Sequence, residues 1–117
     1  MKMSDDQRGD VLIVRPEGRI DTTTSEELER WVAARLDGGT RRLVVDMSAV
    51  DYISSAGLRV FLMTVKKLRG SGGQFVLGGL NTSVRQIFEL AGFLSIFAVE
   101  TDVDRAVARA AGAAGGA

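Results

Sequence analysis

The chain has 117 residues, which is room for one domain. Lysine and arginine number 15 and aspartate and glutamate number 15, so the formal net charge is zero. This balance argues against nonspecific nucleic-acid binding and against a basic membrane-surface protein, because both depend on excess positive charge. Histidine and cysteine are absent, which excludes disulfides, His and Cys metal ligands, and nucleophiles activated by a histidine base.

The sequence also lacks the patterns of a metal site, a signal peptide and a membrane-spanning segment. The acidic residues do not have the spacing of a calcium loop, so we expect no metal and no cofactor. The N-terminal residues lack the apolar core of a signal peptide, and no apolar run long enough to cross a membrane follows. We therefore expect a cytoplasmic protein.

The first predicted element is a buried strand at residues 11–14, a β-branched run stopped by Pro16 and Gly18. The residues before it are compatible with an N-terminal edge strand that turns at residues 9–10. An amphipathic helix follows, and Thr24 with Glu27 fits a capping box at its start. Its apolar residues recur at helical spacing: Leu28, Trp31, Val32 and Leu36.

Strand and helix patterns then continue to alternate. The second clear strand is residues 42–47, and residues 48–55 form a predicted loop with Val50 and Ile53 as buried anchors. Asn81 is placed to cap one of the later helices, and Thr101 or Asp102 another. The later predicted elements are a helix at about 55–68, a strand at 74–77, a helix at about 82–91, a strand at 96–99 and a last helix that ends near 110.

This order predicts an α/β fold with right-handed strand–helix–strand connections. We expect a mixed, mostly parallel sheet of four to five strands and about four helices. The domain should comprise residues 1–112. Residues 113–117 are a Gly/Ala tail without bulky anchors, and we expect this tail to be flexible.

A serine pair, Ser54-Ser55, opens the second helix directly after the predicted loop. Serine at a helix start is usually a cap, and a phosphoacceptor is the alternative. A phosphate on Ser55 would face the free N–H groups of the first turn. Arg59 lies one turn further, within reach of the same phosphate. Gly57 would leave the first turn open to close approach by another protein.

Three blocks in this order make the sequence similar to the STAS domain, named for sulfate transporters and anti-sigma-factor antagonists, in its small free-standing bacterial form. The resemblance covers about residues 8–110. The blocks are EGRID at 17–21, VDMSAV at 45–50 continuing to ISSAGL at 53–58, and VRQIFELAG at 84–92.

The resemblance implies a partner switch. The unphosphorylated antagonist binds an anti-sigma factor that is also a serine kinase, which releases a sigma factor; the kinase then phosphorylates the antagonist, and a serine phosphatase resets it. By motif position the phosphoacceptor is Ser55. Many members have Asp immediately before it where this chain has Ser54, so Ser54 is the alternate acceptor. The implied partner-binding residues are Asp21, Thr22, Ser54, Ser55, Ala56, Gly57 and Arg59.

Two other functions remain open from the sequence. One is a scaffold module of the same fold that works in a transport or multi-protein signalling complex without phosphorylation. The other is an enzyme, which we do not expect because no base stands beside a nucleophile. The sigma factor, the pathway, the oligomeric state and any nucleotide binding are not specified by the sequence.

Overall fold

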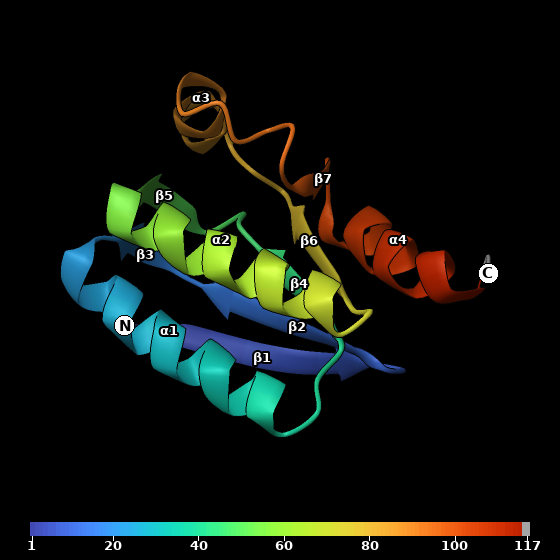
Figure 1. The fold of residues 1–117 in the computed structure, drawn as a ribbon. Helices are drawn as coiled ribbons and strands as arrows, with labels where there is room; N and C mark the ends of the chain where they lie inside the picture. The colour runs from blue at the N-terminus through green and yellow to red at the C-terminus, as the bar shows by residue number, and fades with distance from the viewer. Residues whose placement is uncertain (116–117) are drawn as a thin grey trace.

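The computed structural model describes residues 1–115 (Figure 1). The predicted strands and helices are present, although the last strand lies two residues later than expected. In chain order the elements are β1 (Met3–Arg8), β2 (Val11–Pro16), β3 (Gly18–Ile20), α1 (Thr22–Asp37), β4 (Arg42–Asp46), β5 (Val50–Ile53), α2 (Ser55–Gly70), β6 (Gln74–Gly78), α3 (Thr82–Leu90), β7 (Ala98–Glu100) and α4 (Val103–Gly115).

The main sheet has five strands in the order β1-β2-β4-β6-β7. Strand β1 is antiparallel to β2, and the other neighbours are parallel. The β1–β2 turn contains Gly9 at φ +61°, a left-handed conformation that glycine adopts without strain. The mixed, mostly parallel sheet and its N-terminal edge strand are therefore confirmed.

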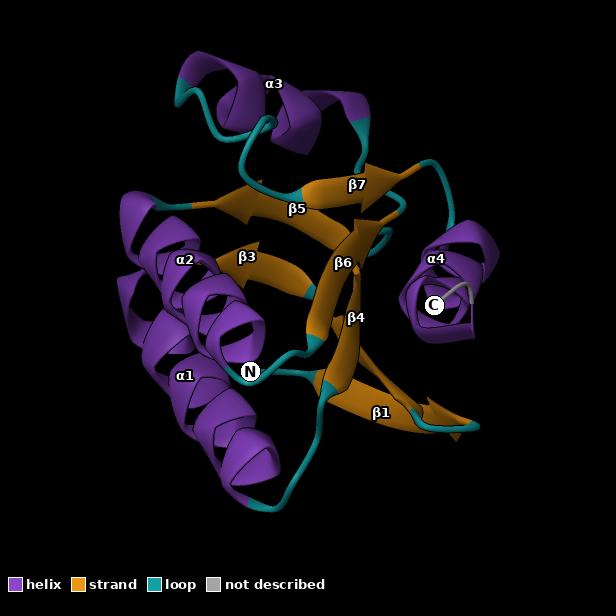
Figure 2. Cartoon of the chain, turned by 45° about the vertical axis from the view of Figure 1, so that its right-hand side comes forward, coloured by secondary structure: helices purple, strands orange, loops and turns teal. Residues whose placement is uncertain are grey.

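Helices cover both faces of the sheet (Figures 1 and 2). Helices α1 and α2 pack side by side on one face, α4 lies on the other, and α3 lies against β5. The larger core lies under α1 and α2, while a smaller cluster faces α4. Strand β2 alternates between them, because Leu12 and Val14 enter the first core and Val11 and Ile13 the second.

The prediction of a loop at residues 48–55 is wrong, because part of it is strand β5. This strand pairs in parallel with β3 in a separate two-stranded sheet, where Ile20 stands opposite Ile53. Both isoleucines are buried. With four and three residues, these strands are too short to show an alternating pattern in the sequence.

The start of α1 also differs from the prediction. The capping box is formed by Asp21 and Thr24: the Thr24 backbone N–H donates to the Asp21 carboxylate at 3.0 Å, and the Asp21 N–H donates to the Thr24 hydroxyl at 2.8 Å. Glu27 is not part of it, because its carboxylate pairs with the N-terminal amine of Met1 at 2.6 Å. The helix therefore begins at Thr22.

The C-terminal helix begins as expected, with the Arg105 backbone N–H donating to the Asp102 carboxylate at 2.8 Å. Helix α4 extends to Gly115. Of the predicted tail, residues 116–117 lie outside the described residues, so its flexibility stays a prediction. Within residues 1–115 no helix combines the length and the apolar character needed to span a bilayer.

Candidate functional site

The first turns of α1 and α2 begin side by side at one end of the two-stranded sheet. Ile20 ends β3 and Ile53 ends β5, and the two are register partners. The next residue of each strand caps a helix, Asp21 for α1 and Ser54 for α2. The Ser54 backbone N–H donates to the Ile20 carbonyl oxygen at 2.8 Å. Short parallel pairing thus brings two predicted site residues together from distant parts of the chain.

Ser54 is the N-cap residue of α2. Its hydroxyl accepts a hydrogen bond from the Gly57 backbone N–H at 3.2 Å, and its carbonyl oxygen accepts from the Leu58 N–H at 2.9 Å. The residue is half-buried. Its hydroxyl oxygen therefore already satisfies a free N–H of the first turn.

Ser55 is the first residue of α2 and is exposed. Among residues 1–115 its hydroxyl has no hydrogen-bond partner, in contrast to that of Ser54. A group attached to this oxygen would lie beside the amino end of a 16-residue helix, where the helix dipole favours negative charge. Of the two serines, Ser55 is the one whose hydroxyl is accessible for modification.

The interpretation that Gly57 gives a partner room to approach is wrong. Gly57 is buried, and a Cβ placed on it would stand 2.7 Å from Ile20 Cγ2 and 2.8 Å from Ile53 Cγ1. These distances are shorter than side-chain contacts permit. Gly57 therefore lets the first turn of α2, which begins at Ser55, pack closely on the β3–β5 pair.

The carboxylate of Asp21 is held in its charged form. Its pKa is lowered from the ordinary value, first by the hydrogen bond from the Thr24 backbone N–H and then by the Thr24 hydroxyl; the N–H of Thr23 and the charge of Arg19 contribute further. Arg19 itself stacks over the Tyr52 ring, 4.4 Å from its centroid. Asp21 thus contributes a fixed negative charge next to the start of α2.

Two hollows flank the first turn of α2. One, of about 180 Å³, lies towards α1 and is lined by Thr22, Ala56 and Arg59 among others. The other, of about 280 Å³, is lined by Ser55 and Arg59 together with four apolar residues: Leu58, Leu62, Ala91 and Phe93. Four of the predicted residues, Thr22, Ser55, Ala56 and Arg59, therefore line these hollows, and Arg59 borders both.

The sequence analysis did not select Leu62 and Ala91 as part of this surface, and it favoured a core role for Phe93 over a contact with a partner. Leu62 falls on the apolar stripe of α2, where a core role is the simplest explanation. Ala91 and Phe93 follow α3; Ala91 lies in the VRQIFELAG block and Phe93 directly follows it. That block was the available signal, but only the fold places it beside Ser55.

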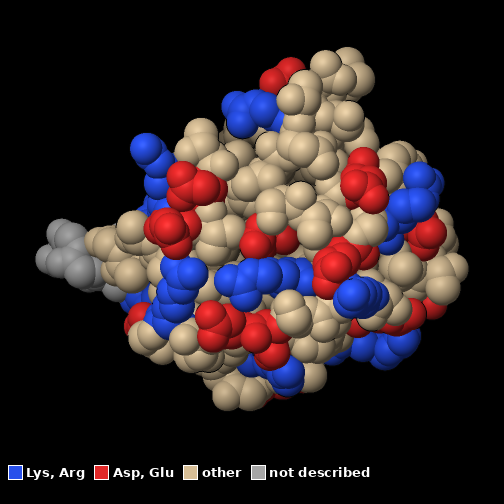
Figure 3. All heavy atoms as spheres, turned by 180° about the vertical axis from the view of Figure 1, so that it is seen from behind, with Lys and Arg blue, Asp and Glu red and all other residues tan. Residues whose placement is uncertain are grey.

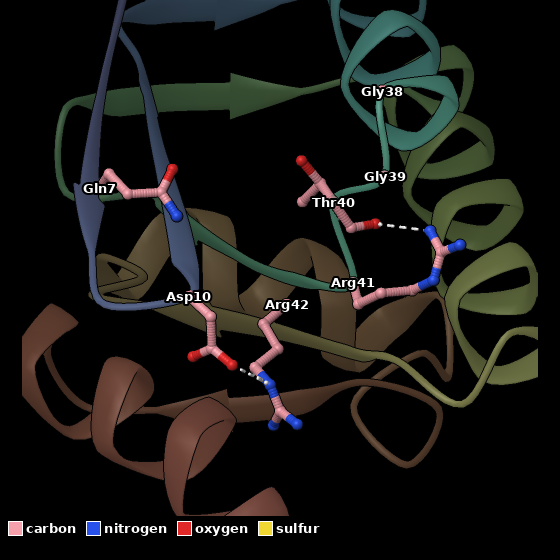
Figure 4. A pocket seen from close by; sticks show the side chains of 7 residues that line it. All are labelled: Gln7, Asp10, Gly38, Gly39, Thr40, Arg41 and Arg42. Atoms are coloured by element: carbon pink, nitrogen blue, oxygen red, sulfur yellow. Dashed lines mark hydrogen bonds and ion pairs between the residues drawn. The ribbon is translucent and has the colours of Figure 1, made fainter.

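A further hollow, of about 420 Å³, lies at the opposite end of the sheet (Figure 4). It is bordered by the β1–β2 turn and the loop that follows α1. Its arginines are engaged: Arg42 donates to the Asp10 carboxylate at 3.0 Å, and Arg41 donates to the Thr40 carbonyl oxygen at 3.3 Å. It contains no residue that the sequence analysis selected.

Charged side chains form no large field of one sign on the face seen in Figure 3, where blue and red groups interleave. Ion pairs between elements fit this arrangement, including Arg8 with Asp104 at 2.7 Å and Arg15 with Asp46 at 3.1 Å. Within the described part of the chain, no group of three acidic side chains is placed to hold a metal ion.

Comparison with known proteins identifies the family of the chain. The model of the STAS domain matches residues 2–106. The chain belongs to the STAS domain family. The STAS chain is 44% identical over 108 residues to BtrV of Bordetella bronchiseptica, which is provisionally described as an anti-sigma factor antagonist; the match covers 92% of this chain and 93% of BtrV.

Two further relatives support the assignment. The anti-sigma-B factor antagonist of Staphylococcus aureus is 29% identical over 86 residues, covering 74% of this STAS chain and 80% of its own. The crystal structure of an anti-sigma factor antagonist from Mycobacterium paratuberculosis superimposes with a TM-score of 0.86 at 27% identity, covering 93% and 92% of the two chains. The predicted fold and family are thereby confirmed.

Proposed function

We propose that this STAS domain is an anti-sigma factor antagonist controlled by phosphorylation of Ser55. In the unphosphorylated state it binds an anti-sigma factor that is also a serine kinase, and a sigma factor is released. The kinase phosphorylates Ser55 and binding is lost, until a serine phosphatase restores it. This exchange takes place in the cytoplasm and needs no catalytic group or cofactor on the STAS domain.

The observation that carries the proposal is the exposed hydroxyl of Ser55 beside a charged neighbour. Ser55 is accessible at the amino end of α2, and Asp21 caps the adjacent α1. The names of the relatives supply the class of partner, since BtrV and the S. aureus protein are described as antagonists of anti-sigma factors. A kinase can reach this oxygen without unfolding the chain.

The physical basis of the switch is electrostatic. A phosphoserine adds about −1.5 to −2 charges. The free N–H groups of the first turn of α2 accommodate this charge in the isolated domain, so its fold persists. In a complex, an unpaired charge buried near Asp21 would cost roughly 3–5 kcal/mol. That cost corresponds to binding weaker by a factor of about 10² to 4 × 10³.

The same geometry selects between the two serines. The Ser54 hydroxyl accepts from the Gly57 N–H and is half-buried, whereas Ser55 is exposed. Phosphorylation of Ser54 would disturb the cap and the first turn that it holds. Ser55 is therefore the preferred acceptor.

The experiment is incubation of the protein with its cognate kinase and ATP, followed by intact-mass measurement. The wild-type protein and Ser54→Ala gain one phosphate, and Ser55→Ala gains none. A phosphate on Ser55→Ala but not on Ser54→Ala would assign the modification to Ser54. No added phosphate on the wild-type protein would favour the scaffold function in a transport or signalling complex.

A further inference from the structure

The hollow between α2 and the end of α3 is apolar in its interior. Leu58 is buried, Leu62 and Phe93 are half-buried, and Ala91 is exposed. The floor is supported from behind, because Phe93 packs edge-to-face on the buried Phe97 with ring centroids 6.2 Å apart. Leu90, which precedes Ala91, is 90% exposed. Exposed apolar surface around a hollow is typical of protein-binding sites.

The rim of this hollow carries positive charge that is not neutralised within residues 1–115. Arg59 borders the hollow and forms no salt bridge within these residues, although Glu26 and Glu29 line the neighbouring hollow that Arg59 also borders. The nearest acid on α3, Glu89, is engaged with Arg85 at 3.5 Å. A carboxylate brought to this rim would therefore find an available cation.

We propose that this hollow is the anchor site for the anti-sigma partner, and that it takes one apolar side chain flanked by a carboxylate that pairs with Arg59. The inference rests on the proposed function and deepens it. At about 280 Å³ the hollow is just smaller than the usual small-molecule pocket of roughly 300 Å³ or more, which suits a side chain of a partner. Such an anchor in a preformed pocket carries much of the energy of an interface.

The anchor site also gives phosphorylation a second route to block binding. Ser55 lines the same hollow as Arg59, and the two are four residues apart on α2, so they share a face of the helix. A phosphate on Ser55 pairs with the Arg59 guanidinium and occupies the cation that the partner's carboxylate needs. When the phosphate pairs with Arg59, binding is lost through this competition; when it does not, the unpaired phosphate charge near Asp21 destabilises the complex.

The test is a calorimetric titration of the anti-sigma factor with variants that fill the hollow, a variant that removes the charge at its rim, and a control variant on α4. Ala91→Glu lowers affinity at least tenfold, by filling the hollow and repelling the flanking carboxylate, and Ala91→Gln lowers it less, by filling alone. Ala108→Glu, at an exposed alanine on α4, changes affinity less than twofold and is the matched control. Arg59→Gln weakens binding about tenfold and flattens its dependence on salt.

The titrations distinguish failure of the anchor site from failure of the antagonist function on which it rests. Equal affinities for Ala91→Glu and Ala108→Glu, with Ser55→Asp still weakened, would overturn the anchor site and leave the antagonist function intact. Equal affinities for all three variants and the wild-type protein would overturn both. A wild-type dimer that becomes monomeric in Ala91→Glu would assign the hollow to a second copy of this chain. Thermal unfolding of each variant verifies that it is folded.

Discussion

The backbone N–H of Ser54 donates to the carbonyl oxygen of Ile20 at 2.8 Å. This hydrogen bond joins the end of β3 to the start of α2 and, together with the pairing of β3 with β5, places the caps of α1 and α2 next to each other. Asp21 and Ser55 consequently share one end of the molecule. A modification of Ser55 therefore acts on a surface that already contains a fixed carboxylate.

Gly57→Ala is expected to destabilise the fold by up to about 2 kcal/mol. The added methyl group would overlap Ile20 and Ile53, both fully buried, and overpacking costs roughly 1–3 kcal/mol. The helix propensity of alanine offsets about 1 kcal/mol of this cost. Denaturant unfolding monitored by circular dichroism measures the difference.

The matched control is Gly70→Ala in the same helix. A Cβ at Gly70 meets no atom within 4 Å, so alanine should be neutral or stabilising by about 0.5 kcal/mol. If both substitutions have the same effect, close packing is not the reason for glycine at position 57.

Asp21→Asn is expected to make stability less dependent on pH. The folded-state pKa of Asp21 lies below its ordinary value of 3.8, because the Thr24 N–H and hydroxyl bind the carboxylate. The stability that Asp21 contributes is therefore present above pH 3.8 and is lost as the pH falls through the lower, folded-state pKa. Asparagine preserves the cap without titrating.

Urea titrations of both proteins between pH 7 and pH 2 measure this effect. The wild-type protein should lose stability relative to Asp21→Asn only in the acidic range, below about pH 4. A constant difference over the whole range would show that the Asp21 carboxylate does not favour its charged form in the folded state.

Ser54→Ala is expected to lower stability by about 1 kcal/mol, because the Gly57 N–H loses its cap. Its binding to the anti-sigma factor should change less than twofold, since the hydroxyl is turned towards its own helix. Thermal unfolding and titration of the same sample measure the two effects. A tenfold loss of binding with unchanged stability would place Ser54 in direct contact with the partner.

Most of the fold follows from the sequence, because β-branched runs and helical stripes are long enough to show their period. The pairing of β3 with β5 does not, since neither strand contains enough residues for a pattern. The N-cap of α1 was misplaced for a related reason: Asp21 and Thr24 are both good caps, and only the tertiary environment of Glu27 decides between them.

Part of the candidate site was likewise predictable from the sequence, and part was not. The position of Ser55 at a helix start was predictable from its neighbours, and its nearness to Asp21 followed from the resemblance to the STAS family. The inward role of Gly57 was not predictable, because its contacts come from two strands distant in sequence. The hollow beside Ser55 likewise needs α2 and the end of α3 to meet.

Titration of the anti-sigma factor with wild-type protein, Ser55→Asp and Ser55→Ala tests the central claim most directly. The account predicts that Ser55→Asp binds at least tenfold more weakly with an unchanged circular dichroism spectrum, and that Ser55→Ala binds like the unphosphorylated wild-type protein even after treatment with kinase and ATP. Equal affinities of Ser55→Asp and the wild-type protein would contradict it.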